Sequence, residues 1–302
     1  MKKVLFLLLS LSMALILVSC TPKVNGTDSE VNAPSSAPGD KDDKDNEDDE
    51  DDETIMYTNI TSDETKNDLK KTLIDEGLDE NDVNFFMNNV DEYNDSADAN
   101  ELASKFTAYN DNVSYNNSID KFAQKNPDFL GINCRITTFS LIKNSLDIEK
   151  ELNDKSSVLD FDKKAISDKS LLNNDDLKKF ITYYAPINVK DAKEDYEDII
   201  MKEVDARGIK FKNEDVKVVS VYLNSNDEID GNILFIGHTG LMYESGKKYY
   251  FLEKLSFQEP YQLLKFNNKK EIYDYLMKKY NQKLDENSHE AIITENNKIF
   301  SY

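Results

Sequence analysis

One stretch decides how the rest of the chain is arranged: Gly131-Ile132-Asn133-Cys134-Arg135-Ile136-Thr137-Thr138-Phe139. Asn133 is a preferred N-cap residue, which predicts that Cys134 occupies the first position of a helix. That helix would carry one apolar stripe, made of Ile136, Phe139, Ile142 and Leu146. The positive end of the helix dipole favours a thiolate at Cys134, and Arg135 favours it further if its side chain turns back. On this stretch alone, Cys134 is equally well explained as a reactive thiol or as a small buried core residue.

Histidine occurs only twice in the chain, and one of the two lies in the stretch Phe235-Ile236-Gly237-His238-Thr239-Gly240-Leu241. From about residue 216 the apolar pattern becomes that of strands, which are predicted over residues 216–223, 232–243 and 247–255. The second histidine, His289, lies in a polar stretch and is expected at the surface.

The turn between the second and third predicted strands sets their register. A two-residue turn at Ser245-Gly246 would pair Glu244 with Lys247 and place His238 directly opposite Glu253, on the same face of the sheet. Their neighbours on that face are then expected to be Leu234, Ile236, Met242, Tyr249, Phe251 and Leu255. An unpaired charge on an apolar face is costly, so His238 and Glu253 should satisfy each other.

Cys134, His238 and Glu253 are the residue types of a nucleophile, a base and a carboxylate that orients the base. We therefore expect a catalytic triad, with Cys134 packed close to His238. Two other interpretations stay open: a structural His–Glu pair in the core, and a zinc site formed by the same three residues. The sequence lacks the close ligand spacing typical of zinc sites, and no metal or other cofactor is predicted.

The first twenty residues have the pattern of a secretory signal peptide. Lys2 and Lys3 precede an apolar segment over residues 4–18, and the segment ends in Leu17-Val18-Ser19-Cys20, which matches a bacterial lipobox. We expect cleavage before Cys20 and lipidation of its side chain. The acyl chains would anchor the protein to the outer face of the cytoplasmic membrane.

Residues 21–53 are predicted to be a disordered acidic tether. The segment from residue 40 to 53 carries eleven acidic residues and two lysines, which cannot form a core and repel one another. The whole chain has a formal net charge of −22, and the part after the tether is acidic as well. Nucleic acid is therefore not an expected partner, because phosphate binding needs clustered Lys and Arg.

Residues 54–302 are long enough for a single domain. Residues 54–130 are predicted to be helical, with one of the helices over residues 102–109. The Cys134 helix and the sheet would form the core of residues 131–302. Further patterns predict a helix over 269–280 and a last strand over 291–294. Helices followed by an antiparallel sheet indicate the α+β class.

Three segments resemble a family of bacterial lipoproteins catalogued as domain of unknown function 4300. They are Asn133-Cys134-Arg135, Gly237-His238-Thr239-Gly240 and Phe251-Leu252-Glu253-Lys254-Leu255-Ser256-Phe257-Gln258-Glu259-Pro260-Tyr261-Gln262. The order of a cysteine on a helix, a histidine on a strand and a polar residue on the next strand is more distantly similar to NlpC/P60 and papain-like thiol hydrolases. That similarity implies a papain-like arrangement and cleavage of peptide or amide bonds, often in cell-wall peptides. No glutamine upstream of Cys134 matches an oxyanion donor, so Asn133 or the Cys134 N–H would have to serve.

Two functions are consistent with these patterns. The first is a membrane-anchored cysteine peptidase or amidase, or an acyl-transfer enzyme, acting on peptide or amide bonds outside the cell. Asn133 and Arg135 would support its triad. The second is a non-catalytic surface lipoprotein that uses the same scaffold to bind an unknown ligand.

Overall fold

A computed structural model describes residues 54–190, 195–281 and 289–302 of the chain. The predicted signal peptide with Cys20 and the predicted tether over residues 21–53 lie outside these described residues. Among the described helices, none is both long enough and apolar enough to cross a membrane.

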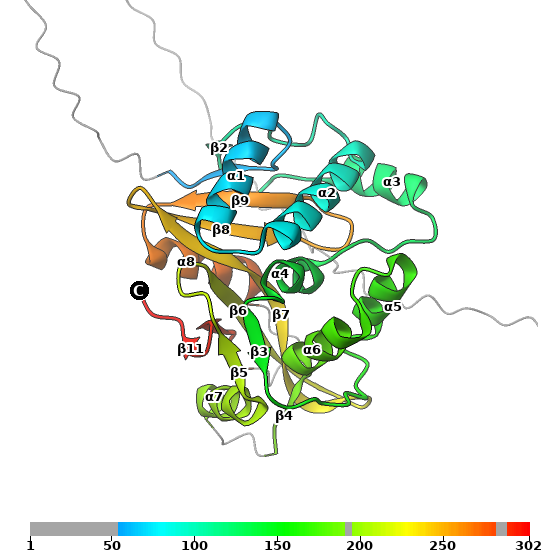
Figure 1. Cartoon of the computed structure of the whole chain (residues 1–302), viewed down its shortest axis with the longest axis vertical. Helices are drawn as coiled ribbons and strands as arrows, with labels where there is room; N and C mark the ends of the chain where they lie inside the picture. Colours follow the sequence, from blue (N-terminus) through cyan, green and yellow to red (C-terminus); the bar gives the residue numbers. More distant parts are fainter. Residues whose placement is uncertain (1–53, 191–194, 282–288) are drawn as a thin grey trace, which may run out of the picture. The chain divides into compact units, whose positions relative to one another are not determined.

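The described part has an α+β architecture, in which helices pack on a large sheet (Figure 1). The strand pairs of this sheet are antiparallel. Its strands are β1 (Met56–Thr58), β2 (Thr107–Ala108), β4 (Ile187–Asn188), β6 (Lys217–Asp227), β7 (Gly231–Ser245), β8 (Lys248–Lys254), β9 (Tyr261–Phe266), β10 (Ile292–Glu295) and β11 (Lys298–Ile299). The strand order is β11-β10-β6-β7-β8-β9-β1-β2, and β4 also pairs with β7. A separate pair is formed by β3 (Leu146–Ile148) and β5 (Ile209–Phe211).

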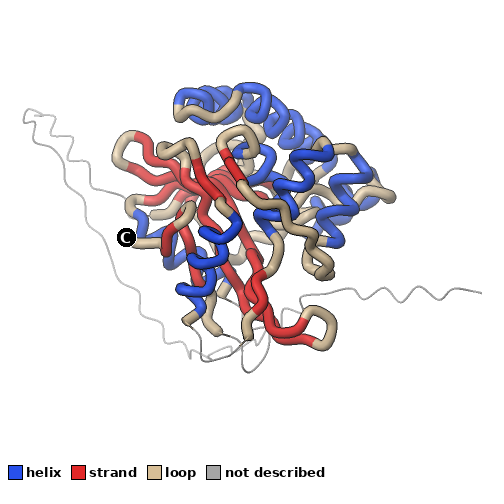
Figure 2. Tube along the Cα trace, turned by 60° about the horizontal axis from the view of Figure 1, so that its bottom comes forward, coloured by secondary structure: helices blue, strands red, loops and turns tan. Residues whose placement is uncertain are grey.

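Helices cover the two faces of this sheet unequally. The described helices are α1 (Asp63–Asp75), α2 (Glu80–Ser96), α3 (Asn116–Lys125), α4 (Cys134–Ile142), α5 (Asp160–Lys169), α6 (Asn174–Tyr184), α7 (Tyr196–Arg207) and α8 (Lys269–Tyr280). The larger apolar core contains buried side chains of α1 to α7, whereas the smaller core contains those of α8. In Figures 1 and 2 the sheet runs between these layers, with α1, α2 and α4 in front of it and α8 behind it in Figure 1.

Residues 54–130, predicted to be helical, are not helical throughout. Residues 54–130 contain α1, α2 and α3, but also the strands β1 and β2 at one end of the sheet. The helix predicted over residues 102–109 is wrong, because this segment forms turns and the short strand β2, whose residues are exposed. Its apolar residues serve as sheet edge and packing contacts rather than as one helical stripe.

The register of β7 and β8 differs from the prediction by two residues. The turn is formed by Gly246 and Lys247, which both have positive φ, so Ser245 pairs with Lys248. Consecutive positive φ values are typical of the tight turns that match the twist of a hairpin. Glu253 therefore lies opposite Gly240 and not opposite His238. A shift of two residues keeps side chains on the same face, because strand side chains alternate with a period of two.

A bulge in β7 changes which residues share a face with His238. The pairing of β6 with β7 shifts between Val221, which pairs with His238, and Tyr222, which pairs with Ile236. Gly237 is the extra residue, and it reverses the alternation on either side of it. Ile236 consequently belongs to the larger core, and the prediction that it shares the face of His238 is wrong. Leu234 is likewise in the larger core, whereas Met242 and Phe251 lie in the smaller core on the α8 side.

Candidate active site around Cys134

The first turn of α4 positions Cys134. Asn133 is the N-cap as predicted, and its side-chain oxygen accepts a hydrogen bond of 3.0 Å from the Ile136 N–H. Cys134 is the first helical residue, so its sulfur lies at the positive end of the helix dipole. Cys134 is a free thiol and is only 6% exposed.

A gap along one edge of β7 receives this first turn. Along that edge β8 pairs with residues from Gly240 onward, and β4 pairs with Ile233 and Leu234. Among the described strands, none pairs with residues 235–239 on that edge. Instead, Arg135 Nη1 donates a hydrogen bond of 2.9 Å to the Ile236 carbonyl, and the Thr239 N–H donates to the Cys134 sulfur. These two contacts hold the start of α4 beside His238.

A buried ion pair fixes the same turn from the other side. Arg135 donates to Asp162 from Nε (2.9 Å) and from Nη2 (2.6 Å), and the Asn133 amide donates to the same carboxylate (2.7 Å). The Asp162 side chain is fully buried on α5. Arg135 and Asn133, both predicted as supporting residues, thus act together on one carboxylate. Because the Asn133 amide faces Asp162, we assign it a positioning role.

His238 connects Cys134 with Glu253. Its Nε2 lies 2.5 Å from Glu253 Oε2, and a side-chain hydrogen bond joins the imidazole to the Cys134 thiol. Since Nε2 is engaged by Glu253, Nδ1 is the ring nitrogen left for the thiol. His238 and Glu253 are 2% and 1% exposed. The three predicted site residues are therefore brought together, although α4 packs on the sheet face opposite to the one that carries Glu253.

Three residues that the sequence did not indicate complete the surroundings of Glu253. Gln262 Nε2 donates to Oε1 (2.7 Å), Tyr275 also donates to Oε1, and the Tyr280 hydroxyl donates to Oε2 (2.9 Å). The Tyr280 ring also stacks on the imidazole of His238, with 3.8 Å between ring centroids and 9° between planes. With both oxygens engaged, Glu253 is held as an acceptor that orients His238.

Electrostatics at the three residues favour charge separation between sulfur and imidazole. Burial opposes ionisation of the Cys134 thiol, but the charge and hydrogen bond of His238, the Arg135 charge and the Thr239 N–H together bring its pKa below the ordinary 9.0. Burial alone would lower the pKa of His238, but Cys134 and Glu253 raise it from 6.5 to about 9. Both shifts act in the direction of a thiolate paired with an imidazolium.

Glu253 supplies the negative charge behind the imidazolium. Burial would raise the pKa of this carboxyl group, but Lys279, His238 and the hydrogen bond from Tyr275 bring it from 4.5 to about 2. Lys279 Nζ lies 3.9 Å from Oε1. The carboxylate is thus charged throughout the range in which Cys134 and His238 titrate.

The other residues singled out in the sequence lie apart from this cluster. His289 is exposed, and its ring lies 4.9 Å from that of Tyr196, between centroids. Across residues 54–190, 195–281 and 289–302, no group of three or more His, Cys, Asp or Glu is placed to hold a metal ion. Glu253 binds the far nitrogen of His238, so it does not converge with Cys134 on one point.

Residues 56–300 match the family described as a domain of unknown function, DUF4300. The match spans most of the chain, and the chain belongs to this family. No curated protein and no solved structure matches this chain.

Proposed function

We propose that this member of a family of unknown function is a thiol-dependent hydrolase or acyl-transfer enzyme with a papain-like arrangement of Cys134, His238 and Glu253. The observation that carries the proposal is the position of His238, whose imidazole is hydrogen-bonded to a thiol on one side and to a fixed carboxylate on the other. This is the arrangement by which a base activates a nucleophile and is itself oriented by a third group.

The reaction follows from the charges at rest. The Cys134 thiolate attacks the substrate carbonyl carbon and forms a C–S bond, and the imidazolium of His238 gives its proton to the leaving nitrogen or oxygen as that bond to carbon breaks. Neutral His238 then takes a proton from water, which attacks the thioester. The C–S bond breaks, the acid is released, and the thiolate and imidazolium are restored. An acceptor amine or alcohol in place of water would make the reaction a transfer.

Backbone N–H groups at the start of α4 are suited to stabilise the oxyanion. The Ile136 N–H is taken by Asn133, whereas the N–H groups of Cys134 and Arg135 have no acceptor among the described residues. Helix N-termini bind anions because their first N–H groups have no partner within the helix. These two donors provide what an upstream glutamine would otherwise supply.

The lipobox that ends at Cys20 is the basis for a proposed location and substrate class. Lipidation of Cys20 would hold the enzyme outside the cytoplasmic membrane, where peptide and amide bonds of the cell wall are the abundant targets. Incorporation of labelled palmitate into wild-type protein, and its loss in Cys20→Ala, would support this location. Wild-type protein that takes up no labelled palmitate would contradict the proposed location.

The activity is tested with acyl esters and peptides as substrates and by mass spectrometry of the protein. A thioester on Cys134 should accumulate with activated esters, and His238→Ala should lower kcat/KM by at least about a hundredfold. His289→Ala is the matched control, because this second histidine is exposed and should leave kcat/KM unchanged. Turnover that survives in Cys134→Ala would exclude Cys134 as the nucleophile.

Burial favours a second candidate, a non-catalytic binding protein in which the same cluster is part of the core. Each of the three side chains is at least nine-tenths buried. In that case iodoacetamide would label Cys134 only in denaturant. Labelling of the folded protein near neutral pH would instead favour the enzyme.

A further inference from the structure

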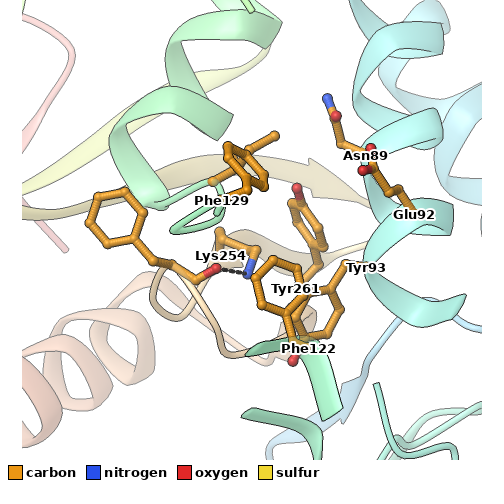
Figure 3. Close-up of a pocket in the computed structure, with 9 residues that line it drawn as sticks. Asn89, Glu92, Tyr93, Phe122, Phe129, Lys254 and Tyr261 are labelled. Carbon is orange, nitrogen blue, oxygen red and sulfur yellow. Dashed lines mark hydrogen bonds between the residues drawn. The ribbon is translucent and has the colours of Figure 1, made fainter. Parts of the chain in front are cut away.

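A pocket lined by aromatic side chains lies next to the candidate active site. Its walls include Tyr93, Phe122, Phe129, Ile132 and Tyr261, and Lys254 lies among the rings (Figure 3). The ring centroids of Tyr93 and Phe122 are 5.6 Å apart, and Lys254 Nζ is 4.3 Å from the Tyr93 centroid and 4.9 Å from that of Tyr261. Phe129 and the α2 residue Asn89 are partly exposed, so the pocket opens to solvent on that side.

The pocket shares two chain segments with the site. Ile132 lies two residues before Cys134, and Lys254 directly follows Glu253. The charges of Lys254 and Cys134 also interact. Gly131 joins these segments: a Cβ at this position, where φ is +113°, would lie 2.0 Å from the Phe257 carbonyl oxygen. Only glycine allows this approach, which keeps the wall near Ile132 against the loop that follows Lys254.

The amine of Lys254 is already bonded within the protein. Lys254 Nζ donates to the carbonyls of Ser256 (2.9 Å) and Glu259, with the Phe257 carbonyl at 3.5 Å. Burial lowers the pKa of Lys254 from 10.5 to about 7, and the three carbonyl oxygens surround its amine. Asn89 and Glu92 also line the pocket, but most of its lining is aromatic and aliphatic carbon. A group that enters the pocket therefore meets mainly apolar surface.

The pocket is also small. Its cavity volume is about 20 Å³, which is close to the room that one water molecule needs. A methyl or similarly short aliphatic group fits this space, whereas a long or aromatic group requires the walls to move.

We propose that this pocket binds a short aliphatic group on the acyl side of the substrate, next to the carbonyl that Cys134 attacks. The inference rests on the proposed function. The acyl group stays bonded to the sulfur after the leaving group departs, and Ile132, two residues before Cys134, lines the pocket. The pocket would thereby select acyl groups by length.

The test uses the full-length protein and chloromethyl ketones that carry a methyl, propyl or pentyl group. Cys134 displaces chloride and forms a stable thioether, so labelling needs no turnover. Wild-type protein should react fastest with the methyl compound, and Phe129→Ala, which removes a partly exposed wall, should shift the preference towards pentyl by about tenfold or more. Phe161→Ala is the matched control, because this α5 residue is 61% exposed and does not line the pocket.

The outcomes separate the two proposals. Cys134 that resists all three reagents in the folded protein would overturn the proposed function. Cys134 that reacts with all three at the same rate, in wild type and in Phe129→Ala alike, would leave the function standing and overturn the assignment of the pocket. Circular dichroism and thermal unfolding of Phe129→Ala establish that the variant is folded. Ile132→Ala, at another lining residue, provides a second enlargement that should shift the preference in the same direction.

Discussion

Two buried pairs of a cation and a carboxylate flank the start of α4, and they differ in what their charges can do. Asp162 accepts from Arg135 and Asn133, and Arg135 stays charged at every pH at which the protein is folded. Glu253 accepts from His238, whose proton can leave, and from neutral donors. The first pair fixes the helix, whereas the second can exchange a proton with Cys134.

Removal of the Asp162 carboxylate should have the largest effect on stability. In Asp162→Ala the guanidinium of Arg135 stays buried without its carboxylate, which should lower the free energy of unfolding by about 3–5 kcal/mol. Denaturant unfolding measures the loss. Asp160→Ala is the control, because this residue lies on the same helix, is 66% exposed and pairs with Lys163 at 3.0 Å. Equal stability of the two variants would show that the Arg135 pair does not anchor α4.

The Asn133 cap and the contact of His238 with Glu253 could both be predicted from the sequence. The contact, however, was predicted from an incorrect register of β7 and β8. The prediction of this contact still held because a register shift of two residues keeps both side chains on the same face of the sheet. The actual turn places Lys247 at a φ of +64°, a conformation that its residue type does not indicate.

The partners Asp162 and Tyr280 could not be predicted from the sequence, for a different reason. Asp162 lies 27 residues from Arg135, and Tyr280 lies 27 from Glu253. No periodicity links residues across such separations, so the contacts depend on how whole elements pack. The bulge at Gly237 was also missed, because a glycine within a strand indicates a bulge only when its partner strand is known.

The stability that Glu253 contributes should depend on pH in the acid range. Its pKa is about 2 in the folded protein against an ordinary 4.5, so the unfolded chain takes up the proton first. The stabilisation is present above pH 4.5 and is lost as the pH falls through about 2. We expect this loss to be on the order of 2 kcal/mol and to be missing from Glu253→Gln, whose side chain does not titrate. Unfolding curves of the two proteins at several acidic pH values measure it, and curves that stay parallel would contradict the assignment.

The hydroxyl of Tyr280 should have a smaller effect. Tyr280→Phe keeps the ring that stacks on His238 but removes the 2.9 Å hydrogen bond to Glu253 Oε2, and it should destabilise the protein by about 1–2 kcal/mol. Thermal unfolding measures this, with Tyr302→Phe, at an exposed position, as the control. A Tyr280→Phe variant as stable as this control would mean that the hydroxyl does not hold the carboxylate.

We expect Cys134 in the folded protein to be a thiolate paired with the imidazolium of His238. The ultraviolet absorbance of the thiolate, titrated in wild type and His238→Ala with Cys134→Ser as the blank, tests it most directly. We predict thiolate absorbance in the wild type near neutral pH, and a midpoint in His238→Ala that moves towards or above 9.0, because burial then acts without the neighbouring positive charge. A wild-type thiol that ionises only above 9.0, with the same midpoint in His238→Ala, would contradict the account.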